Sequence, residues 1–168
     1  MWSRRALLAC LPAAGLALSG CGFRPLYGRG DGQGLAAAAE FSSIIIPPIP
    51  DRSGQLLRNA LRDRLTPRGV PANPRYRLDV TLNEQRSDLV ILRDATSTFA
   101  KMRFSAAYAL VDFESGKAVT QGRAESTTTF NIVESQFANI SAESDARRRA
   151  ADELAEDIRL RLGLHFHR

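Results

Sequence analysis

The chain has 168 residues, of which 23 are Lys or Arg and 18 are Asp or Glu, and its net charge is +5. This length suits one domain. The basic residues are nearly all arginine and are interleaved with acidic residues, which argues against a nucleic-acid-binding protein.

The first 20 residues have the pattern of a secretory signal peptide. Arg4 and Arg5 precede an uncharged apolar run at residues 6–18, and small residues follow it. The run is shorter than the roughly 20 residues that span a bilayer, so a permanent transmembrane helix is not expected. Leu18-Ser19-Gly20-Cys21 resembles a lipobox. We therefore predict cleavage before Cys21 and an anchor of N-palmitoyl and S-diacylglycerol groups on that cysteine.

Cleavage would leave Cys21 as the only cysteine, which excludes an internal disulfide and a cysteine-based metal cluster. Residues 21–40 are rich in Gly and Ala and are predicted to form a flexible tether. Phe23, Leu26 and Tyr27 make an apolar cluster directly after the lipid site. We expect this cluster to pack on the domain, on a partner or at the membrane interface. Residues 41–168 are predicted to form a single domain.

The domain is predicted to begin with a strand and a helix. Residues 41–49 contain three consecutive isoleucines followed by prolines at positions 47, 48 and 50, which indicates a buried strand ended by those prolines. Apolar residues then recur at helical spacing from Leu56 to Leu65. Asp51 or Ser53 is expected to cap this helix, and Pro67 with Gly69 to end it.

Three strands are predicted next. Residues 75–83 alternate strictly between apolar and polar side chains, and residues 89–92 continue the strand after a break at residues 86–88. Residues 99–112 alternate again, with Lys101 and Arg103 outward. A turn at residues 114–117 leads into a threonine-rich strand at residues 119–130.

A helix opened by Ser141 or Ser144 is predicted to close the chain. Its apolar stripe is Ala146, Ala150, Leu154, Ile158 and Leu162, and charged residues four apart support its other face. The stripe needs a sheet to cover it. The prediction is an α+β fold of order β-α-β-β-β-α, with two helices packed on one face of a mostly antiparallel, mixed four-stranded sheet.

The sequence offers no convincing catalytic centre. Both histidines, His165 and His167, lie near the chain end, where neither a metal site nor a Ser-His-Asp nucleophile is expected. The glycines at positions 28, 30, 32 and 34 belong to the tether and do not join a strand to a helix. We therefore expect no enzyme activity, no metal and no cofactor.

Three blocks of sequence resemble the lipopolysaccharide-assembly lipoprotein LptE family. The first is Cys21-Gly22-Phe23-Arg24-Pro25-Leu26-Tyr27-Gly28. The second is Tyr108-Ala109-Leu110-Val111-Asp112 with the turn Ser115-Gly116-Lys117. The third is Ser135-Gln136-Phe137-Ala138 leading through Glu143-Ser144-Asp145-Ala146 into Ala150-Ala151-Asp152-Glu153-Leu154-Ala155. The blocks occur in the same order as in the family, and the resemblance spans essentially the whole chain after Cys21.

The resemblance implies an outer-membrane lipoprotein that faces the periplasm and plugs the lumen of the LptD β-barrel in a one-to-one complex. Such a plug assists lipopolysaccharide transport to the outer leaflet without catalysis. In the family, basic residues of the sheet are associated with lipopolysaccharide, and Lys101, Arg103 and Lys117 are the nearest candidates here. The alternative is a lipid-anchored periplasmic binding module or hydrolase unrelated to lipopolysaccharide export.

Overall fold

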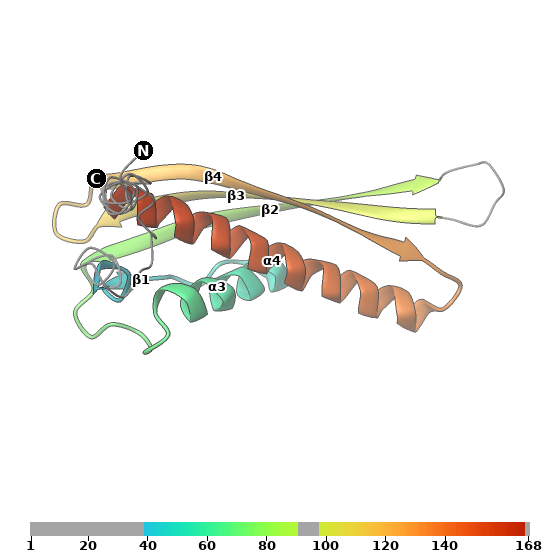
Figure 1. Cartoon of the computed structure of the whole chain (residues 1–168), viewed down its shortest axis with the longest axis horizontal. Coiled ribbons are helices and arrows are strands. Elements are labelled where there is room, and N and C mark those ends of the chain that lie inside the picture. The colour runs from blue at the N-terminus through green and yellow to red at the C-terminus, as the bar shows by residue number, and fades with distance from the viewer. Residues whose placement is uncertain (1–38, 91–97, 167–168) are drawn as a thin grey trace, which may run out of the picture.

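The computed structural model describes residues 39–90 and 98–166. They form an elongated two-layer α+β structure in which both helices lie on the same side of a long, twisted sheet (Figure 1). The element order is β1, α3, β2, β3, β4 and α4, which confirms the predicted fold class.

The sheet is dominated by three strands of equal length. These are β2 (Tyr76–Val90), β3 (Thr98–Asp112) and β4 (Ala118–Ile132), each of 15 residues. They pair antiparallel in chain order, and the short β1 (Ile44–Ile45) adds parallel to β2. Side chains along each strand alternate between the helix side and the open side. The inward row of β3 is apolar, whereas β2 and β4 also carry polar side chains on the helix side, among them Glu84, Ser126 and Thr128.

The core lies between the sheet and the two helices, α3 (Asp51–Leu65) and α4 (Gln136–Phe166). Met102, Phe104 and Leu110 of β3 are almost completely buried, as are Ala106 and Tyr108 between them. The predicted α4 stripe is also buried, at Ala146, Ala150, Leu154, Ile158 and Leu162. Its alanines let the helix lie close to the sheet, while Leu and Ile fill the remaining space. The inward faces of β3 and α4 are thus confirmed.

The first strand is shorter than predicted. Phe41 ends a helical turn at residues 39–41, and Ser43 Oγ donates to the carbonyl oxygen of Glu40. After Ile45 the prolines lack the N–H groups that a strand ladder needs. Ile46 and Ile49 are nevertheless buried, so this segment contributes to the core without being a strand.

The predicted break in β2 is wrong, because the strand continues through residues 86–88. Arg86 and Asp88 occupy positions on the helix side of the strand, where polar residues are unexpected. Arg86 Nε lies 2.9 Å from Asp88 Oδ1, and its Nη1 lies 2.8 Å from Glu143 Oε2 on α4. These ion pairs allow a polar stretch to remain in the sheet. Residues 91–97 lie outside the described residues.

Both predicted helix starts also need correction. The residue before α3 is Pro50, which forms no side-chain cap, and Ser53 Oγ instead donates to Glu84 Oε2 on β2. The last helix begins at Gln136 rather than at Ser141 or Ser144. Ser135 caps it, because Ser135 Oγ accepts from the backbone N–H of Ala138 at 3.3 Å.

A half-buried polar network joins α3, β2 and α4. Arg147 Nε donates to Glu84 Oε1 at 3.0 Å, and its Nη2 donates to Glu143. Burial lowers the pKa of Arg147, but its hydrogen bonds and charge interactions with Glu84 and Glu143 outweigh that effect and raise it. The guanidinium therefore stays charged and holds the three elements in one register.

Candidate functional site

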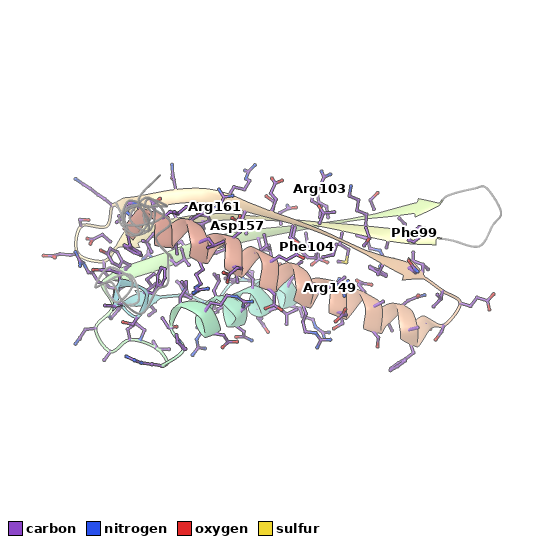
Figure 2. All side chains as sticks on the ribbon, in the orientation of Figure 1. Phe99, Arg103, Phe104, Arg149, Asp157 and Arg161 are labelled. Atoms are coloured by element: carbon purple, nitrogen blue, oxygen red, sulfur yellow. The ribbon has the colours of Figure 1, made fainter. Side chains whose placement is uncertain are left out.

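The open face of the sheet is the side that neither helix covers (Figure 1). Side chains from β2, β3 and β4 project from it, and Figure 2 shows Arg103 directed away from the helices while its neighbour Phe104 points toward α4. Strand pairing places Gln85, Arg103 and Thr127 in one row across the sheet. The face is mostly hydroxyl, amide and charged groups. Its basic members are Arg77, Lys101, Arg103 and Arg123, and its acidic members are Asp79 and Glu125.

A shallow hollow of about 600 Å³ lies in the middle of this face. Ala107 and Ala109 of β3 have short side chains there, while the longer side chains of Thr81, Gln121 and Arg123 surround them. Arg123 lines this hollow and also a second one, of about 260 Å³, which it shares with Arg103. The two hollows give a polar surface with an arginine at their junction.

Lys101 and Arg103 lie on the open face, but Lys117 does not join them. Lys117 lies in the turn between β3 and β4, whereas Arg103 is nine residues from Asp112 at the end of β3. At about 3.3 Å per strand residue, this separation is about 30 Å. Arg123 takes the place expected of Lys117, because it lies opposite Ala107 on the same face. Lys101, Arg103 and Arg123 form no ion pair with any other described residue.

A second exposed feature, here called the corner patch, lies where β4 turns into α4. It consists of Val133, Phe137 and Ile140, whose exposed fractions are 50%, 79% and 60%. Asn139 fixes this corner, because its side-chain amide bonds the backbone N–H and carbonyl of Val133 at 2.9 and 2.8 Å. Apolar side chains gathered at an exposed, rigid corner are typical of a contact surface.

Comparison with protein families identifies the chain. The family model LptE, described as lipopolysaccharide-assembly, matches residues 41–162, which is well over half of the sequence. The chain belongs to the LptE family. The sequence-based recognition of this family is therefore confirmed.

Solved structures share the LptE-like architecture. A protein assigned as a lipoprotein from Caulobacter crescentus CB15 is 27% identical with a TM-score of 0.67, covering 79% of this chain and 96% of that one. A minor lipoprotein from Acinetobacter baumannii is 20% identical with a TM-score of 0.56, covering 72% of this chain and 88% of that one. The second likeness concerns the fold alone. No curated protein sequence matches this LptE-family chain.

Several predicted features of this LptE-family chain lie outside the described residues. They are the signal peptide at residues 1–20, the lipid site Cys21, the cluster Phe23, Leu26 and Tyr27, and His167. His165 lies in the last turn of α4 beside Phe166, with 5.6 Å between ring centroids. Residues 39–90 and 98–166 contain no group of three or more His, Cys, Asp or Glu side chains suited to a metal ion. None of the helices in that part of the chain is long and apolar enough to cross a membrane.

The turn between β3 and β4, part of the second sequence block that resembles LptE, is stabilised by a carboxylate. Asp112 Oδ1 accepts from the backbone N–H of Ser115 at 2.7 Å and from its hydroxyl at 2.8 Å. The backbone bond, followed by the hydroxyl bond, lowers the pKa of Asp112 below its ordinary value. Because folding favours the charged form, this contribution to stability is present above the ordinary carboxyl pKa of about 4 and is lost as pH falls through the lowered pKa.

We therefore expect Asp112→Asn to lower stability at neutral pH and to have less effect in acid, where the native carboxyl is protonated. Urea unfolding midpoints at neutral pH and over a series of decreasing acidic pH values measure this difference. Glu114→Gln in the same turn is the matched control, because Glu114 is exposed and its side chain makes no hydrogen bond among the described residues. An equal loss of stability at neutral and acidic pH in Asp112→Asn would contradict the role of the charge.

Proposed function

We propose that this protein is an outer-membrane lipoprotein that occupies the lumen of the LptD β-barrel in a one-to-one complex and assists lipopolysaccharide transport to the outer leaflet. Membership of the LptE family over residues 41–162 is the observation that carries the proposal. Cys21 would hold the protein to the inner leaflet of the outer membrane through its lipid chains. The protein would act by binding and positioning, without catalysis.

The open sheet face supports a position inside a barrel. The interior of a large outer-membrane barrel is polar, so a plug must present polar side chains to it. The open face supplies threonine hydroxyls, amides and arginines over the length of three 15-residue strands. An isolated hydrolase or carrier would need a convergent site, and the hollows on this face are shallow and open.

The corner patch is the surface that we expect to contact the barrel protein. Tagged full-length protein extracted in detergent should recover LptD in a one-to-one ratio. The double variant Phe137→Asp with Ile140→Asp should reduce that recovery at least about tenfold, which corresponds to roughly 1.4 kcal/mol of binding free energy. Two new carboxylates would have to be desolvated in the contact.

Leu164→Asp is the matched control for the corner patch, because Leu164 is also on α4 and is 57% exposed. It should leave LptD recovery unchanged. If the unaltered protein recovers no barrel protein, the plug function is excluded and the lipid-anchored periplasmic module or hydrolase becomes the better explanation. If recovery persists in the double variant, the barrel contacts another surface.

Basic residues of the open face are the proposed contacts for the phosphorylated sugars of lipopolysaccharide. Arginine presents a planar fork that suits phosphate groups, and Lys101, Arg103 and Arg123 are not engaged in ion pairs within the described chain. Replacing all three with Ala should weaken binding of purified protein to lipopolysaccharide by about tenfold or more, if charged hydrogen bonds contribute about 1.5–3 kcal/mol each. The affinity of the unaltered protein should also fall as salt is raised.

Lys117→Ala is the control for this experiment, because Lys117 lies at the far end of the sheet. The sequence alone grouped Lys117 with Lys101 and Arg103, which predicts a large effect of Lys117→Ala on affinity for lipopolysaccharide. The arrangement in the structure predicts a small effect. An affinity that is the same in the triple variant and in the unaltered protein, over a series of salt concentrations, would rule out this face as the lipopolysaccharide contact.

A further inference from the structure

An apolar pocket lies at the edge of the sheet beside β1, distinct from the two hollows of the open face and from the corner patch. Its volume is about 320 Å³. Apolar side chains from three parts of the chain line it, namely Ile45, Pro47, Pro48, Val70, Pro71 and Phe113. We call it the β1 pocket. Within the described chain, nothing fills it.

The β1 pocket has rigid walls. Two consecutive prolines fix the backbone on one side. Arg58 of α3 then ties that backbone to the helix, because its Nε donates to the carbonyl oxygens of Ile46 and Pro47 at 3.0 and 3.1 Å. Val70 and Phe113 remain 60% and 56% exposed at the pocket although both are large apolar side chains. A preformed apolar pocket with uncovered walls favours an apolar occupant.

The pocket is lined by residues close to the start of the described chain, and this indicates which segment could occupy it. The described structure begins at Ala39, and Ile44, only five residues later, already lines the pocket. Phe23, Leu26 and Tyr27 precede Ala39 by a linker of residues 28–38 that contains four glycines. A glycine-rich chain of this length averages about 18 Å from end to end and spans about 35 Å when extended. The segment can therefore reach the pocket of its own chain, at a high effective concentration.

We propose that the segment from Phe23 to Tyr27 docks in the β1 pocket of the same chain. Its phenylalanine, leucine and tyrosine match the apolar walls, and its proline limits the entropy lost on binding. Arg62 and Arg77 at the pocket provide guanidinium groups on which an aromatic ring can stack. β1 is also an edge strand, so an extended segment can lie along it.

Docking would fix how the domain is oriented at the membrane. Phe23 is two residues from Cys21, so a docked segment places the lipid anchor beside β1 and the β3–β4 turn. The opposite end, with the corner patch, would then point away from the membrane surface that holds the lipid. This consequence depends on the lipidation proposed above, but the docking itself does not.

A single tryptophan tests the proposal in the full chain. The only tryptophan of the sequence, Trp2, lies in the predicted signal peptide, so Trp2→Phe combined with Tyr27→Trp leaves one reporter whether or not residues 1–20 are removed. Because pockets bury about 70–90% of a ligand's surface, acrylamide quenching should be roughly threefold weaker than for free tryptophan. Adding Val70→Asp and Phe113→Asp should restore quenching. Circular dichroism checks that this variant stays folded, as expected for two exposed positions.

The matched control adds Val133→Asp and Phe137→Asp, which place the same two charges at the corner patch. This control should leave quenching low. Full exposure of the reporter in the otherwise unaltered chain would overturn the proposal, provided that Phe23→Trp in the same background is equally exposed. Protection that survives Val70→Asp with Phe113→Asp would also overturn it and would indicate the detergent or membrane as the occupant. Protection that depends on protein concentration would instead indicate a second copy of the chain.

Discussion

Phe104→Ala is expected to lower the free energy of unfolding by about 3–5 kcal/mol. Phe104 lies near the middle of β3, the strand with long partners on both sides, and is only 1% exposed on the helix side. Removing the ring loses its transfer free energy and leaves a cavity. The long strands pair over 15 residues each, so they cannot move inward locally to close that cavity.

The adjacent residue provides the control for Phe104. Arg103 projects from the opposite face (Figure 2) and is exposed, so Arg103→Ala should change stability by no more than about 0.5 kcal/mol. Urea unfolding followed by circular dichroism measures both variants. In Phe104→Ala, a lower urea midpoint with an unchanged dependence of the unfolding free energy on urea concentration would assign the loss of stability to packing. Similar losses of stability in the two variants would mean that both faces of the sheet are packed, contrary to the structure.

Alternation and helical periodicity predicted the parts of the fold that depend on burial alone. β3 follows the expected inward row from Met102 to Leu110, and the α4 stripe faces the sheet as expected. Both patterns are informative because one face of each element is buried and the other is exposed to solvent. Their signals are local in sequence, so no knowledge of a distant partner is needed.

Features that depend on distant partners were not predictable in the same way. Ser53 has the sequence position of a helix cap, yet its hydroxyl bonds Glu84, 31 residues away. Arg86 and Asp88 suggested a break in β2 because Glu143, the second partner of Arg86, lies far along the chain on α4. In both cases a tertiary contact satisfies polar groups that local reasoning assigns to a cap or a loop.

Of the three basic residues proposed as contacts, Lys101 and Arg103 were predicted, but Arg123 was missed because of an irregularity near the β3–β4 turn. Val111 pairs with Ala118 but Leu110 pairs with Thr120, so Val119 is an extra residue in β4. Counting back from the turn without this bulge would place Arg123 opposite Ala106, on the buried side. A shift of one residue moves every later side chain to the other face. The bulge thus brings Arg123 to the open face with Arg103.

Arg147→Ala is the second substitution with a large expected effect, because one guanidinium serves two carboxylates. Arg147 is 25% exposed, and its removal leaves Glu84 without its cation, while Glu143 keeps only its ion pair with Arg86. We expect a loss of about 1–3 kcal/mol, less than for a fully buried pair because solvent screens these charges in part. Arg147→Lys should recover only some of it, since an ammonium cannot bond both carboxylates in the planar arrangement.

Arg149→Ala provides the comparison within the same helix. Arg149 is 48% exposed and pairs with Asp145 on the helix surface, so its removal should cost no more than about 0.5 kcal/mol. A double-mutant cycle of Arg147→Ala with Glu84→Gln isolates the interaction between α4 and β2, for which we expect about 0.5–3 kcal/mol. A coupling energy near zero would mean that Arg147 stabilises α4 alone. The ion pairs would then be a consequence of how the helix and strand pack rather than what holds them in register.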